Sequence, residues 1–185
     1  MSSQAFAETL VTAQSDGTAN TAGTAASCIP AAAVITLPQG YWKNIGQQLL
    51  IKASGRISSV ITTPGTARYD VRLGGTVVFD GLAVLLDTVA AHTNVGWMLE
   101  ILLTCRAIGA TGNFMGQGLW TCEDILGVPA TAPKGVEAAM LPWNSAPAVG
   151  GNINTASALS LDLFFTQTAA TGSMTLHQYS AISLN

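Results

Sequence analysis

The sequence predicts an all-β protein, an antiparallel two-sheet sandwich of jelly-roll type with an extended N-terminal arm. From Val34 onward, short apolar segments alternate with polar residues at a period of two, which is typical of strands with one buried face. Gly, Pro and Asn interrupt these segments at the spacing of turns. We therefore expect about eight or nine strands and few helices.

The N-terminal residues differ in composition from the rest of the chain. Ala, Thr, Ser and Gly dominate them, and no period is sustained, so they offer little bulk to bury. We expect residues 1–33 to form an arm outside the core and residues 34–185 to form a single β-sandwich domain. The arm is equally consistent with a disordered tail and with a segment that becomes ordered only against a neighbouring subunit. In the second case Phe6, Leu10 and Val11 would be its anchors.

The clearest strand of the predicted sandwich begins at Trp97. Its odd-numbered positions are apolar and form one face, whereas Glu100 and Arg106 lie on the other. A Gly-rich turn at 108–112 leads into a second strand at 114–122. The two strands are expected to form a long hairpin.

A second turn is predicted at Gly74 and Gly75, a dipeptide favoured in two-residue turns that need positive φ. A strict register around this turn would place Asp70 opposite Phe79. The pairing therefore requires either a bulge or cover on both faces of the strands.

Two further segments complete the predicted strand order. Residues 159–166 and 174–184 alternate on either side of a Gly-containing turn, which predicts that another hairpin closes the chain. Residues 127–151 hold four of the seven prolines and show little alternation, so we expect them to form a long excursion on the surface.

Charged residues are scarce in this chain. They make up 9% of it, against about 25% in typical soluble proteins, so we expect much of the surface to contact other protein. The basic residues are scattered singly, which disfavours direct nucleic-acid binding. We expect no membrane span, because no apolar run approaches about 18 residues, and no secretory signal.

No constellation of polar residues indicates catalysis. His92 and His177 have no persuasive partner in the pattern, and no G-x-S-x-G nucleophile motif is present. Glu123 and Asp124 are adjacent, and neighbours in a strand point to opposite faces. We expect a protein that is not an enzyme and that has no catalytic residue, no cofactor and no metal site.

The cysteines and tryptophans are interpreted mainly as core residues. The cysteines lack CxxC or zinc-site spacing, and we expect buried thiols at Cys28, Cys105 and Cys122. Trp97 and Trp120 fall on predicted core faces. Trp42 and Trp143 lie in turn-like settings and remain available as contacts at an interface.

Several segments together resemble small structural proteins of tailed bacteriophages, of the capsid decoration or head-associated type. These segments are LPQGYW (37–42), LLIKASGRIS (49–58), YDVRLGGTVV (69–78), NVGWMLEILLTCRAIGATGNFMGQG (94–118) and LSLDLFFTQT (159–168). The resemblance covers most of residues 35–185 and leaves the arm outside it. It consists of strands and turns, so it carries over no functional residue, and it implies a virion protein with a jelly-roll body.

Two hypotheses of function follow from these observations. In the first, the chain is a virion structural protein, made in the host cytoplasm, that binds and stabilises the assembled shell as a symmetric oligomer such as a trimer. Its partners would be the major capsid protein or other virion subunits and copies of itself. The expected assembly contacts are Phe6, Leu10, Val11, Trp42 and Trp143. In the second, the chain is a glycan- or receptor-binding module of a tail fibre or collar.

Overall fold

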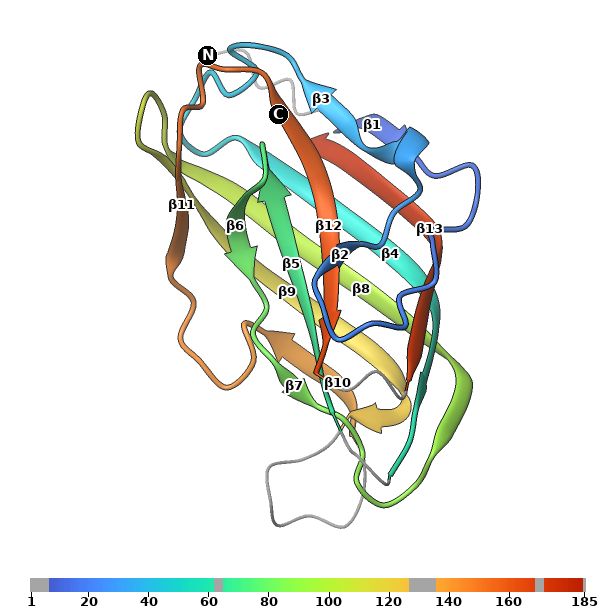
Figure 1. Cartoon of the computed structure of the whole chain (residues 1–185). Coiled ribbons are helices and arrows are strands. Elements are labelled where there is room, and N and C mark those ends of the chain that lie inside the picture. Colours follow the sequence, from blue (N-terminus) through green and yellow to red (C-terminus); the bar gives the residue numbers. More distant parts are fainter. Residues whose placement is uncertain (1–6, 62–64, 127–135, 169–171, 185) are drawn as a thin grey trace.

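Two antiparallel sheets lie face to face in the computed structural model, which describes residues 7–61, 65–126, 136–168 and 172–184 (Figure 1). The seven-stranded sheet has the order β1 (Ala7–Thr12), β13 (Ser173–Leu184), β4 (Gln48–Ser59), β8 (His92–Ala107), β9 (Gly112–Leu126) and β10 (Val136–Leu141), and β11 (Val149–Ile153) also pairs with β9. The six-stranded sheet has the order β2 (Ala26–Ser27), β12 (Leu159–Gln167), β5 (Thr66–Leu73) and β6 (Thr76–Asp80), with β3 (Ile35–Leu37) on β12 and β7 (Val84–Leu85) on β5. The predicted antiparallel sandwich is confirmed. Among the described residues, the helical structure is a single short 3-10 turn, η1 (Ala31–Ala33).

The chain passes several times from one sheet to the other, including between β4 and β5 and between β12 and β13. As a result β13 lies beside β4 in one sheet while β12 lies beside β5 in the other. The prediction that residues 159–166 and 174–184 form a hairpin is therefore wrong. Alternation determines which side chains face the core, but it is the same whether a strand pairs with its neighbour in sequence or with a distant strand.

The core lies between the sheets and contains the apolar face predicted for the strand that starts at Trp97. Trp97, Leu99, Ile101 and Leu103 are all buried there. Tyr69 from the opposite sheet places its ring centroid 5.3 Å from that of Trp97, so the two sheets interdigitate at this point. The hairpin of β8 and β9 is confirmed.

The turn between β5 and β6 also follows the prediction. Gly74 and Gly75 have φ values of 56° and 83°, which residues with a Cβ rarely adopt. The register shifts beyond Val71, so that Asp70 faces Asp80 rather than Phe79. A bulge therefore resolves the conflict that the sequence showed.

The prediction that residues 1–33 contribute no core element is wrong for residues 7–33. β1 pairs with β13, β2 pairs with β12, and Cys28 and Ile29 are buried in the core. Asn20 exchanges backbone hydrogen bonds of 2.8 and 3.0 Å with Met174. A Cβ at Gly17 would lie 1.9 Å from the carbonyl oxygen of Cys28. The segment is thus held by main-chain bonds that small residues permit, and apolar bulk is not required.

The predicted excursion at 127–151 is only partly irregular. Its first residues, 127–135, lie outside the described part of the chain. β10 and the start of β11 fall within the rest and both pair with β9. These strands are short and rich in Ala and Gly, so they leave little alternation in the sequence.

Candidate functional site

The outer face of the seven-stranded sheet carries a cluster of exposed apolar side chains. Met98 is 65% exposed, Leu119 40% and Met140 60%, and they stand on the adjacent strands β8, β9 and β10. Leu102 on β8 is 37% exposed and extends the cluster along its strand. Contiguous exposed apolar side chains of this kind mark contact sites more often than scattered ones do.

The strand register aligns outward side chains in rows across the sheet. The central row, from β10 to β1, consists of Met140, Leu119, Glu100, Lys52, Ser180 and Thr12. Its two halves differ, because β10 and β9 present long apolar side chains whereas β13 and β1 present short polar ones. In the neighbouring row a large apolar side chain again lies beside a small polar one at the centre of the sheet, with Met98 on β8 beside Ser54 on β4, but the flanking members of this row are Thr121 on β9 and Gln178 on β13.

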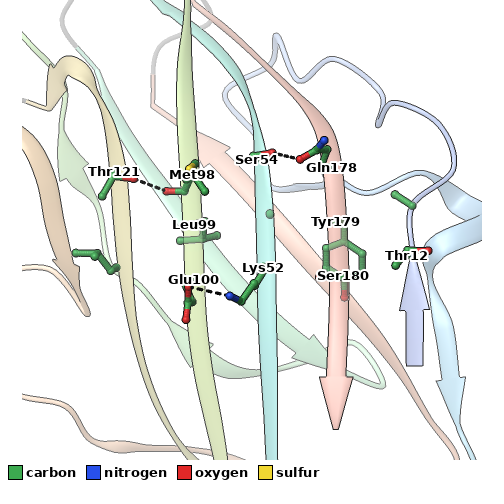
Figure 2. Close-up of a pocket in the computed structure, with 13 residues that line it drawn as sticks. Thr12, Lys52, Ser54, Met98, Leu99, Glu100, Thr121, Gln178, Tyr179 and Ser180 are labelled. Carbon is green, nitrogen blue, oxygen red and sulfur yellow. Dashed lines mark hydrogen bonds and ion pairs between the residues drawn. The ribbon is translucent and has the colours of Figure 1, made fainter. Parts of the chain in front are cut away.

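This difference in side-chain length hollows the face. A depression of about 500 Å³ lies over its centre, and Thr12, Ser54 and Ser180 line one side while Met98 lines the other (Figure 2). Leu119 also lines this depression. A second depression of about 800 Å³ adjoins it and extends the hollow along the strands. The face is therefore a broad concave surface with raised apolar side chains on one half.

The charges at the centre of this face neutralise each other. Lys52 Nζ lies 3.4 Å from Glu100 Oε2, and both side chains are about half exposed (Figure 2). Such an exposed pair contributes about 0–1 kcal/mol to stability. Its main effect is that the middle of the apolar face carries no net charge.

The candidate contact residues expected from the sequence lie elsewhere. The prediction that Trp42 is available as an interface contact is wrong. It is only 4% exposed, and its ring packs edge-on against Phe114 at a centroid distance of 4.7 Å. Leu10, Val11 and Trp143 are half-buried and pack against the core of their own chain. Phe6 lies outside the described residues.

The sequence does contain a signal for the exposed apolar cluster, although the cluster was not predicted from it. Met98 and Leu102 occupy the outward positions of a strand whose inward positions are also apolar. An outward Met or Leu in such a strand indicates that both faces are used. What the alternation could not show is that Leu119 and Met140 stand beside them.

Both histidines have carboxylate partners, contrary to expectation. His92 Nε2 lies 3.0 Å from Asp87 Oδ2, and His177 Nδ1 lies 2.9 Å from Asp16 Oδ1. Burial raises the pKa of Asp87, but hydrogen bonds from His92 and two backbone N–H groups outweigh it, and the pKa lies below its usual value. Asp87 thereby holds the chain that leads into β8.

The thiols of the core are buried, as predicted, and none of the three cysteines forms a disulfide. Burial raises the pKa of Cys28 and of Cys105, so both stay protonated at neutral pH. Over the described residues, no cluster of His, Cys, Asp or Glu is arranged to hold a metal ion. The same part of the chain contains no helix long and apolar enough to cross a membrane.

No family model matches the sequence, and no curated protein matches it. A comparison with solved structures finds a similarity to the CBM2 module of the evolved Dit protein of Lactobacillus casei BL23 phage J-1. The TM-score is 0.36 and the sequence identity is 9%, over 81% of this chain and 67% of that one.

Proposed function

We propose that this chain is a non-catalytic structural subunit of a virus particle, of the capsid decoration or head-associated type. The observation that carries the proposal is the uncovered apolar face formed by Met98, Leu119 and Met140 on adjacent strands. The resemblance of residues 37–42, 49–58 and 94–118 to small structural proteins of tailed phages supports a place in the virion.

The chemistry of this face favours a protein partner. The cores of protein interfaces are depleted in charge and enriched in Met, whose flexible side chain adapts to a facing surface. Here the central charges are a neutral pair, Lys52 and Glu100, and the side chains around it are Met, Leu, Ser and Thr. The partners would be the major capsid protein or other virion subunits and copies of the chain itself, in a symmetric oligomer.

The alternative is a glycan- or receptor-binding module of a tail fibre or collar. Sugar rings are commonly held on exposed aromatic side chains. Among the large exposed apolar side chains of the described residues, none is aromatic. The same face could also bind a protein receptor. To test the glycan-binding alternative, the experiment below includes a measurement of glycan binding.

The test is incorporation into particles of the virus that encodes the chain. Leu119→Glu places a charge in the apolar half of the face, and we expect it to reduce the copies bound per particle by about tenfold or more. Thr166→Glu on the outer face of the other sheet is the matched control. We expect it to bind as wild type does.

Equal incorporation of both variants would contradict the proposal, provided that circular dichroism shows both to be folded. Specific binding of the wild-type chain to a glycan array, undisturbed by Leu119→Glu, would support the alternative instead.

A further inference from the structure

We infer that the outer face of the seven-stranded sheet binds a second copy of this chain, through a two-fold axis that runs along the strands between β4 and β8. This inference rests on the proposed function of that face as a protein contact. Apart from β11, the sheet has three strands on each side of this line: β1, β13 and β4 on one, and β8, β9 and β10 on the other. A two-fold interface joins the same patch on both copies, so it requires a surface that is complementary to itself.

The rotation exchanges the two halves of the face and keeps each row at its level. β8 of one copy then lies over β4 of the other, β9 over β13, and β10 over β1. In the central row, Glu100 of each copy comes to face Lys52 of the other. The two ion pairs become a group of four alternating charges, which is attractive in this arrangement and repulsive where like charges face each other.

At two positions a large apolar side chain of one copy also comes to lie over a small polar side chain of the other. Met98 of one copy lies over Ser54 of the other, because these residues pair across β8 and β4. Leu119 lies over Ser180, which shares its row. Met98 and Leu119 of one copy thus enter the central hollow of about 500 Å³ of the other, on the side that its Ser54 and Ser180 line. Packing of large residues over small ones is how facing sheets interdigitate.

The row below the ion pair adds an apolar contact near the axis. Leu50 pairs with Leu102 across β4 and β8, so each Leu102 comes to lie over Leu50 of the second copy. Ile182 on β13 continues this row beyond Leu50. The four leucines of the two copies would meet where the faces are closest.

The size of the face suits a stable pair. Strands lie about 4.8 Å apart and outward residues about 6.8 Å apart along a strand, so four strands with about five outward residues and two short edge strands with about three cover roughly 850 Å². That is about the area each partner contributes to a standard protein interface. Two such faces would pack with their strands within about 30° of each other.

The experiment is sedimentation velocity of the full chain over a wide concentration range. We expect wild type to form dimers, and Lys52→Glu and Glu100→Lys to raise the dimer dissociation constant by about tenfold or more, because each places like charges over each other. Lys43→Glu makes the same change of charge at an exposed residue away from the face and should dimerise as wild type does.

The decisive sample is an equimolar mixture of the Lys52→Glu and Glu100→Lys chains. In a mixed pair, both carboxylates of one chain face both lysines of the other, so the mixture should form heterodimers although neither variant pairs with itself. An effect confined to the ion pair within one chain cannot produce this rescue.

A wild-type chain that stays monomeric, a trimer, or a mixture that stays monomeric would overturn the inference. If the chain is monomeric while Leu119→Glu still loses incorporation into particles, the proposed function stands and the inference of a second copy fails. If dimers form as expected but Leu119→Glu is incorporated normally, the proposed function fails instead.

Discussion

The outer faces of the two sheets differ in how far their side chains are covered by contacts within the chain. On the six-stranded sheet, Arg72 donates to Asp70 at 2.6 Å and stacks over the ring of Phe164 at 3.7 Å. Arg68 donates to Asp80 at 2.6 Å on the neighbouring strand. The carboxylate of Asp70 is almost fully buried. The charged and aromatic side chains of this face are therefore partnered within the chain itself.

On the seven-stranded sheet the apolar side chains stay exposed, and the central pair of Lys52 and Glu100 is long and half-exposed. An exposed Met or Leu gains from burial, whereas a satisfied ion pair gains little from a partner. The comparison shows that a low content of charged residues does not leave every face of the protein available for contact with a partner. Over the described residues, charged side chains stand on both sheets, but only on the seven-stranded sheet do they leave a group of large apolar side chains exposed, at Met98, Leu119 and Met140.

The largest expected effect tests whether both faces depend on the N-terminal segment. Deleting residues 1–30 removes β1 from one sheet and β2 from the other, together with the buried side chains of Cys28 and Ile29. Full burial of such a side chain is worth about 1.5–3 kcal/mol, so we expect the deletion to cost more than about 3 kcal/mol or to prevent folding. Chemical denaturation measures the loss. An unchanged midpoint would show that the segment is a tail after all.

The next effect compares the two sides of a single strand. Leu99 faces the core and is 2% exposed, whereas Met98 faces outward. We expect Leu99→Ala to cost about 2–5 kcal/mol of unfolding free energy and Met98→Ala less than about 0.5 kcal/mol. If Met98→Ala were as costly in the isolated chain, the outer face would be part of the core and not a contact surface.

A smaller effect compares the ion pairs of the two faces. Asp70→Ala leaves the guanidinium of Arg72 without its bonded partner in a site where that side chain is 22% exposed. We expect a loss of about 1–3 kcal/mol. Glu100→Ala, its counterpart on the other face, should change stability by less than about 0.5 kcal/mol. Equal losses, measured by denaturation at neutral pH, would remove the contrast between the faces.

The smallest effect concerns Asp162 on the outer face of the six-stranded sheet. Burial raises the pKa of its carboxyl above the usual value, although a hydrogen bond from Ser27 opposes the shift. Since the folded state holds this proton more tightly than the unfolded state, the ionised carboxylate costs stability at neutral pH, and this cost disappears as pH falls through the folded pKa.

We therefore expect Asp162→Asn to stabilise the chain at pH 7, by less than about 1 kcal/mol, because Asn can still accept the bond from Ser27. The gain should vanish near pH 3, where both side chains are neutral. Denaturation at the two pH values checks the sign, and a loss at pH 7 would show that the charge of Asp162 supports its face.

The sequence by itself determined the properties that act over a few residues. Period-two alternation identified the inward face from Trp97 to Leu103, and Gly74 and Gly75 predicted their own turn, because pleat and positive φ are local constraints. The conflict of register near Val71 was also visible in the sequence, which left a bulge or cover on both faces as solutions, and the structure has the bulge. The outward Met98 and Leu102 could have been noticed in the same way.

Only the tertiary structure decided which strands are neighbours. It placed β13 beside β4 instead of β12, joined residues 7–33 to both sheets, buried Trp42 against Phe114, and brought Met140 next to Leu119. Alternation states which way a side chain points but not which distant strand lies alongside. That choice depends on main-chain hydrogen bonds and core packing summed over the whole chain, so no single segment contains it.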